Sequence, residues 1–204
     1  MRNTLRMLAL VVVGWALAGC ASTTLQSAWV DTSFRGGPFK KIVVVGAGTN
    51  LTNRRVFEDI FSQQLVAAGT QAVPGYQVLP DDARANEPAW NAGVAQSGAD
   101  GLLLVRILGV DTKTTVTTTM VPGPAFYGPY YGGWWGPPMV AVPEVSQYDI
   151  ANVETNLVDV KSRRVVWAGT TQTFNPTTVA KETPGFAQVI IQQLAARGLI
   201  APVK

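Results

Sequence analysis

The run Lys41–Val45, which reads KIVVV, places apolar side chains at consecutive positions and ends at Gly46. Consecutive β-branched residues favour a strand that is covered on both faces, so this segment belongs in the middle of a sheet. From Val56 to Ala68 apolar residues recur at steps of three and four, as in an amphipathic helix, with Thr52 as a candidate N-cap and Gly69 at the end. A strand followed by such a helix is the opening unit of an α/β fold.

The patterns after this first unit continue to alternate between strand and helix. They predict a short strand (76–79), a helix (87–97), a long strand (102–119), a hairpin of two strands (147–160 and 165–174) and a final helix after Thr183-Pro184. Strands joined through helices run parallel and a hairpin is antiparallel, so the sheet is mixed. We predict a single α/β domain over residues 40–200. Three helices pack a sheet of about five strands, in the order β-α-β-α-β-β-β-α, as a two- or three-layer sandwich.

The composition excludes several common kinds of catalytic and metal site. Of the 204 residues 47% are hydrophobic and 14% are charged, which favours a packed core over disorder. The chain has no histidine and one cysteine, which rules out His/Cys zinc sites, internal disulfides and catalysis by a histidine base. We therefore predict a protein that is not an enzyme and has no catalytic residue, no metal and no cofactor.

The amino-terminal segment has the features of an export signal. Arg2 and Arg6 precede Met7–Leu17, which is apolar and carries no charge. As a helix this run is about 17 Å long, short of the roughly 30 Å of a bilayer core. This is typical of a signal peptide. The signal ends in Leu17-Ala18-Gly19-Cys20, which resembles the lipobox of bacterial lipoproteins. The alternative is an ordinary secretory signal with a chance cysteine.

The lipobox resemblance implies that residues 1–19 are removed and that Cys20 carries acyl chains on its sulfur and its new amino group. Ala21-Ser22 after the cysteine resembles the pattern of lipoproteins held in the outer membrane, with the domain facing the periplasm. Three acyl chains make a stable anchor, whereas one is marginal. Residues 20–39 are rich in serine, threonine and glycine, which predicts an extended tether of about 25 Å.

The charge of the mature chain gives no indication of nucleic-acid binding. Without Arg2 and Arg6, 14 basic residues face 13 acidic ones. Basic pairs such as Lys40-Lys41 and Arg163-Arg164 are scattered along the chain, which is typical of a solvated surface. We predict no nucleic-acid partner.

Several segments resemble an uncharacterised family of Gram-negative outer-membrane lipoproteins. They are Gly37–Gly46, Arg54–Asp59, Ala72–Tyr76, Ser97–Gly101 and Val166–Thr170. More loosely, the architecture is similar to that of the periplasmic domains of the curli secretion lipoprotein and of lipoproteins that activate peptidoglycan synthases. The closer resemblance implies no established activity, and the looser one concerns the fold alone.

Residues 121–143 form a Gly/Pro-rich aromatic loop between the third and fourth predicted strands. Ten of the seventeen residues from Pro122 to Pro138 are glycine or proline, which excludes a regular helix or strand. Aromatic side chains with polar tips suit half-wet surfaces, so the loop is a candidate partner contact. The alternative is a flap that covers one face of the sheet. The candidate contacts are Phe126, Tyr127, Tyr130, Tyr131, Trp134 and Trp135.

Arg54 and Arg55 are a candidate anion contact. They fall in the first turn of a predicted helix, where the helix dipole disfavours cations. An anion bound at the helix N-terminus would offset this effect. The alternative is pairing with Glu58 and Asp59, which lie four residues further along.

Together these features favour a membrane-anchored periplasmic lipoprotein that acts as a non-enzymatic binding or adaptor module of the cell envelope. Its acyl chains hold it to the membrane, and its expected partner is an envelope protein or peptidoglycan. A second hypothesis is an oligomeric structural or secretion component of the outer membrane, in which the ribbon 112–119 and the aromatic loop enter the membrane. A third is an enzyme acting on cell-wall glycan or lipid. The sequence does not determine the oligomeric state.

Overall fold

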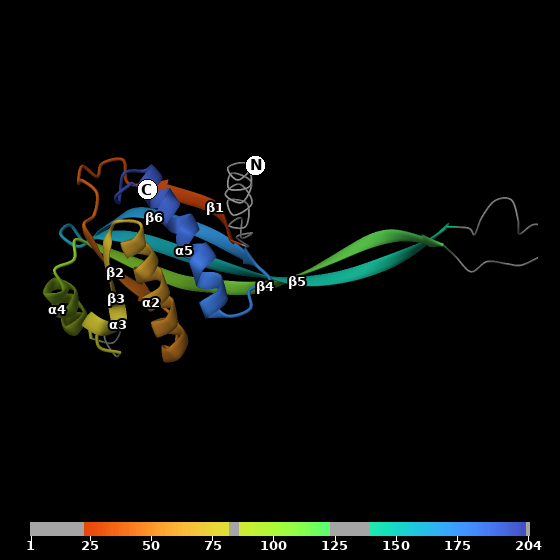
Figure 1. Ribbon diagram of the computed structural model, residues 1–204, viewed down its shortest axis with the longest axis horizontal. Coiled ribbons are helices and arrows are strands. Elements are labelled where there is room, and N and C mark those ends of the chain that lie inside the picture. The colour runs from red at the N-terminus through yellow and green to blue at the C-terminus, as the bar shows by residue number, and fades with distance from the viewer. Residues whose placement is uncertain (1–22, 82–85, 123–138, 203–204) are drawn as a thin grey trace, which may run out of the picture.

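In the computed structural model, which describes residues 23–81, 86–122 and 139–202, a mixed sheet of six strands has the order β1-β6-β5-β4-β2-β3 (Figure 1). Strand β2 is parallel to β3 and β4, and the other neighbouring pairs are antiparallel. The predicted α/β domain with a mixed sheet is therefore confirmed. The elements are β1 (Thr23–Val30), β2 (Lys41–Gly46), α2 (Leu51–Ala67), β3 (Gln71–Pro74), α3 (Gly75–Val78), α4 (Glu87–Ser97), β4 (Gly101–Pro122), β5 (Met139–Asp159), β6 (Arg164–Phe174) and α5 (Val179–Ala196).

Strand β2 is covered on both faces, as its apolar run predicts. Ile42 and Val44 belong to the larger core cluster, together with residues of α2 and α5. Val43 and Val45 belong to a second cluster, which includes Leu79 and residues of α4. Successive side chains of a strand point to opposite faces, so helices lie on both sides of the sheet at this point. The sheet here is the middle layer of three.

The chain after α2 differs from its prediction, which gave one short strand at 76–79. The strand is β3, where Ala72 and Val73 pair with Ile42 and Val43 of β2. The predicted strand residues instead form α3, a single helical turn. The Tyr76 N–H donates to the Glu58 carboxylate at 2.8 Å, so a side chain from α2 satisfies the start of this turn. The fold therefore has four described helices in place of three.

The predicted tether over residues 20–39 is wrong for Thr23–Val30, which form β1. This strand pairs antiparallel with β6, and this pairing brings the sheet from about five strands to six. The Thr23 and Thr173 hydroxyls lie 2.8 Å apart across the pair. Threonine is a good strand former, and an edge of β6 is available to pair. Val30 and Phe34 pack against the larger core cluster, so burial of their apolar side chains stabilises this segment against the sheet.

Two helix starts also differ from the sequence prediction. The N-cap of α2 is Asn50, whose side chain accepts from the Asn53 N–H, and Thr52 lies inside the helix. Helix α5 begins at Val179 behind the N-cap Thr178, so Pro184 lies inside the helix. In both cases a polar residue earlier in the chain can accept from the first free N–H groups, and the helix begins there.

The predicted long strand is confirmed, and its partner is longer than predicted. Strands β4 and β5 pair antiparallel from Gly101 and Asp159 to Pro122 and Met139, and their outer part leaves the domain as a two-stranded ribbon (Figure 1). The loop predicted for 121–143 therefore contains strand at 121–122 and 139–143. Pro143 is compatible with this because a two-stranded ribbon consists only of edge strands, where a missing N–H is tolerated.

In the part of the chain that the structure describes, no helix is long and apolar enough to cross a bilayer.

Gly198 follows α5 with a φ of 66°, in the left-handed region that glycine adopts without strain. The chain then returns towards the sheet, where the Phe39 N–H donates to the Leu199 carbonyl at 2.8 Å.

Asp31 fixes the end of β1 through its carboxylate. The Ser33 hydroxyl and N–H donate to Oδ1, and Arg164 of β6 donates to Oδ2. These contacts, led by the Ser33 hydroxyl, lower the pKa of Asp31 below its usual value of 3.8.

We predict a pH-dependent contribution from this carboxylate. Because its pKa is lowered in the folded state, its stabilisation is present above about pH 4 and is lost as the pH falls through the lower folded value. Asp31→Asn should reduce the urea midpoint at pH 7 and remove part of the decline below pH 4. Urea titrations at a series of pH values measure this. A variant whose midpoint declines with pH as steeply as that of the native protein would contradict it.

Candidate interaction site

The outer part of the β4–β5 ribbon has two different faces. Side chains that are directly opposite in an antiparallel pair share a face. Val116 is opposite Val145, Met120 is opposite Ala141, and every second residue pair along the ribbon points the other way. We call one side the apolar face: Val116, Thr118, Met120, Pro122, Met139, Ala141, Pro143 and Val145. The other side is the threonine face: Thr115, Thr117, Thr119, Val121, Val140, Val142, Glu144 and Ser146.

The apolar face is exposed to solvent. Val116 and Val145 are each 62% exposed and Met120 is 60% exposed. On the threonine face, Val140 and Val142 near the outer end are also exposed, so the last few residue pairs are apolar on both sides. Contiguous exposed apolar surface on a monomer commonly marks a site that binds another protein, a membrane or a ligand. The ribbon is therefore the candidate interaction site.

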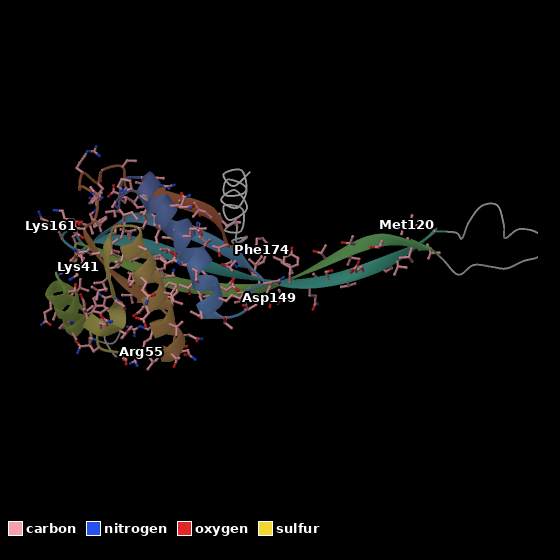
Figure 2. The ribbon with its side chains drawn as sticks, viewed as in Figure 1. Lys41, Arg55, Met120, Asp149, Lys161 and Phe174 are labelled. Carbon is pink, nitrogen blue, oxygen red and sulfur yellow. The ribbon has the colours of Figure 1, made fainter. Side chains whose placement is uncertain are left out.

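A β-bulge lies where the ribbon leaves the domain. The register shifts between Ile107 and Gly109, which leaves Leu108 as the extra residue. Ile107, Leu108 and Val110 are more than half exposed. Figure 2 marks this level by Asp149 and Phe174, with Met120 near the far end of the ribbon and Lys161 at the opposite end of the domain. We call the exposed apolar residues around this point the neck: Ile107, Leu108, Val110 and Phe174.

The buried polar cluster of the domain surrounds Glu58 of α2, which is fully buried. Its Oε1 accepts from the Gly46 N–H at 3.0 Å and from Arg54 Nε at 2.8 Å, and its Oε2 accepts from the Tyr76 N–H at 2.8 Å. The cluster lies at the carboxyl ends of β2 and β3, which is where open α/β sheets commonly bind ligands. Here the protein's own donors occupy the carboxylate, so its role is to join α2, β2 and α3.

The structure brings Arg54 and Arg55 together around Asp81. Arg54 pairs with Glu58 and has Nη1 3.6 Å from Asp81, while Arg55 contacts Asp81 at 3.0 Å. The pairing alternative thus describes Arg54, but Arg55 pairs with Asp81 and not with Asp59, whose carboxylate accepts from the Tyr76 hydroxyl. An anion site at Arg54 and Arg55 stays a prediction, and it would have to compete with these carboxylates.

The other predicted site residues lie outside the described residues. These are the lipid-attachment residue Cys20 and the six aromatic contacts Phe126, Tyr127, Tyr130, Tyr131, Trp134 and Trp135. Lipid attachment at Cys20 and partner contact through the six aromatic residues therefore remain predictions.

A surface hollow of about 900 Å³ lies at the end of the domain opposite the ribbon. Its lining includes Phe34 and Phe39, whose rings stack at 5.6 Å, and the carboxylates Asp100 and Asp159. Asp100 accepts from the backbone N–H groups of Lys40 and Lys41, and Asp159 accepts from that of Ser162. Both carboxylates therefore hold turns of the backbone.

Sequence reasoning missed the strand residues 139–146 and the exposed neck. The signal that could have found the first is the valine-rich apolar run Met139–Val142, which is typical of a strand, together with the alternation from Val116 to Met120 in the strand before it. The neck has no comparable signal, because Ile107 and Leu108 continue an apolar run that is buried from Leu102 to Val105 apart from the partly buried Leu104.

No protein-family model matches this chain, and no curated protein does. Among solved structures, PelC from Paraburkholderia phytofirmans, a dodecamer, is similar at 15% identity over 83% of this chain and 95% of that one, with a TM-score of 0.45. The lipoprotein GNA1162 from Neisseria meningitidis is similar at 12% identity over 76% and 98%, with a TM-score of 0.38. At TM-scores below 0.5 these likenesses carry no function over to this chain. The resemblance to an uncharacterised lipoprotein family stays a prediction.

We predict that Glu58→Gln destabilises the domain strongly. The amide has one acceptor oxygen for three N–H donors and leaves the buried Arg54 charge without its closest carboxylate, which should cost about 3 kcal/mol of unfolding free energy. Urea denaturation measures the loss. The matched control is Glu154→Gln, which breaks the exposed pair with Arg106 and should cost less than about 1 kcal/mol. Equal losses in the two variants would contradict the assignment.

Proposed function

We propose that this chain is a lipid-anchored, non-enzymatic binding module of the Gram-negative outer membrane. Its α/β domain faces the periplasm and holds the β4–β5 ribbon against another component of the envelope. The observation that carries this proposal is the ribbon itself, which projects from a packed domain and exposes its apolar face (Figure 1). The signal-peptide pattern and the lipobox resemblance at Cys20 support the location.

The ribbon suits binding because it is both apolar and held in place. Fully burying a valine or methionine side chain is worth about 1.5–3 kcal/mol, so contact through Val116, Met120 and Val145 alone yields a substantial free energy. The strands of the ribbon are also strands of the central sheet, so the domain fixes the direction in which the ribbon points. A partner therefore meets a surface that is already formed, which lowers the entropic cost of binding.

The polar groups of the domain support a binding role over a catalytic one. Glu58, Asp81, Asp100 and Asp159 accept from arginines or backbone N–H groups of neighbouring segments. Each of these contacts holds the fold together. Catalysis by carboxylates needs groups that face a shared space where a substrate can sit.

Two variants of the full chain in intact cells test the proposal. Cys20→Ser should shift the protein from the membrane fraction to the soluble fraction and abolish incorporation of labelled palmitate, because the anchor is lost. A photo-crosslinking amino acid in place of Val116 should capture lipid or protein, whereas the same group in place of exposed Gln192 on α5 should capture much less. A Cys20→Ser protein that still sediments with membranes, or equal capture at both positions, would count against it.

An oligomeric structural or secretion component is the second candidate. The observation that favours it is the length of the ribbon: Thr112–Pro122 and Met139–Asp149 are eleven residues each, within the roughly 9–11 residues of a membrane-crossing β-strand. Such a ribbon has an unpaired edge on each side, which copies of the chain would have to pair. The native mass of the detergent-extracted protein distinguishes this candidate from a monomeric binding module. A ring of copies is expected on this alternative, and a monomer excludes it.

A further inference from the structure

Strand β1 begins at the end of the sheet from which the ribbon projects. Strand β1 begins at Thr23, three residues after Cys20, and Thr23 pairs with Thr173 next to Phe174. Three residues of extended chain span at most about 11 Å. If Cys20 is acylated, as the proposed function holds, Thr23 therefore lies within about 11 Å of the acylated residue. Across the sheet, Thr173, Ala151 and Val110 continue the row of Thr23, so the neck residue Val110 is three strand spacings, about 14 Å, from Thr23. The link from Cys20 to Thr23 is much shorter than the tether that the sequence predicted, because β1 is part of the sheet.

The ribbon starts at the same end of the sheet, from β4 and β5. From Thr112 to Pro122 it extends about 33 Å at the usual rise of a strand. Figure 2 shows the order along the molecule: Lys161 at one end, Asp149 and Phe174 at the neck, and Met120 far out on the ribbon. An element of this length that begins beside a membrane either lies along it, crosses it or points away from it.

Exposed apolar side chains favour contact with lipid over the orientation that points away. The exposed neck residues Ile107, Leu108 and Val110 lie at the same end of the sheet as the start of β1, three strands across, and the apolar face of the ribbon follows further out. Within residues 115–122 and 139–146 the one charged side chain is Glu144, on the threonine face, whereas Lys113 and Asp149 lie closer to the neck. Contact with lipid buries the exposed apolar groups and leaves the threonine face in water.

The described strands are too short on their apolar side to cross the bilayer. From Val116 to Pro122 the apolar face is about 20 Å long, against an apolar band of about 25 Å in membrane barrels, whose strands are also tilted. Closer to the neck the same face carries Thr114 and Gln147, then Thr112 and Asp149. The ribbon edges also carry unpaired backbone groups, which headgroups and water can satisfy but hydrocarbon cannot.

We infer that the ribbon rests on the lipid bilayer with its apolar face towards the lipid. Its outer end, apolar on both sides, dips into the interface, and its strands do not cross the membrane. This inference rests on the proposed function, because the acylated Cys20 sets the height of the neck. The ligand surface is the bilayer itself, and the threonine face remains open to the periplasm.

Site-specific fluorescence on the full-length acylated protein tests this placement. The chain has one cysteine, whose sulfur the acyl group occupies, so an introduced cysteine is the only reactive thiol. Val116→Cys, its neighbour Thr115→Cys on the threonine face, and Lys161→Cys at the opposite end are labelled with a polarity-sensitive fluorophore. The proteins are reconstituted into vesicles of phosphatidylethanolamine and phosphatidylglycerol that carry a spin-label quencher at the headgroup or at the end of the acyl chain.

We expect blue-shifted emission at Val116→Cys, quenched more by the headgroup label than by the deep label. Thr115→Cys and Lys161→Cys should emit as in water. As a second readout, a Met120→Cys probe should lose its blue shift when Val116→Glu is added and keep it with the matched change Thr115→Glu, because only the first places a charge against lipid.

Three results would overturn the inference. They are emission from Val116→Cys as in water, stronger quenching by the deep label, and a probe that remains in water in vesicles at a position that captures a protein in cells. The last result would assign the apolar face to a protein partner. Failure of the anchor is separate: an unacylated Cys20 removes the proposed function, whereas an acylated protein with its ribbon in water removes this inference alone.

Discussion

The hydrogen-bonded ladder between β4 and β5 is the interaction on which both the core and the projecting ribbon depend. It runs from Gly101 and Asp159 to Pro122 and Met139, with one register shift at Leu108. Its inner part contributes Leu103, Val105 and Leu157 to the buried core. Among the described strands, none lies beside its outer part. The same pairing thus builds the middle of the sheet and carries an apolar surface about 33 Å beyond it.

The change from buried to exposed along β4 follows from what covers the sheet. Helices α2 and α5 pack over the inner residues through Phe61, Leu65 and Phe186 and do not extend over the ribbon. The bulge at Leu108 marks this limit, because an extra residue there strengthens the local twist and redirects the strand pair. The polarity of the outer residues then alternates with the pleat, which gives the ribbon its two faces.

Local patterns predicted the elements that depend on local chemistry. The apolar run of β2, the periodic helix α2 and the pairing of Arg54 with Glu58 could all be read from nearby residues. Features that depend on distant segments could not be predicted from nearby residues. Strand β1 needs the edge of β6, the contact of Arg55 with Asp81 needs the chain after α3, and the outer part of β5 needs a partner across the intervening residues 123–138. In threonine-rich and proline-containing segments, the local sequence is a weak indicator of a strand when the partner strand is remote in the chain.

The docking of β1 also sets how the fold bears mechanical load. On the proposal that Cys20 is acylated, a pull on the anchor reaches the domain at Thr23, and its component along the axis of β1 is perpendicular to the hydrogen bonds that join β1 to β6. In this shear direction the bonds of the pair resist together, whereas a pull across the strand would open them one after another. Along this direction the pairing of β1 with β6 continues from Thr23 to Trp29 and Val30 at the far end of the strand, so the whole pair would share such a load.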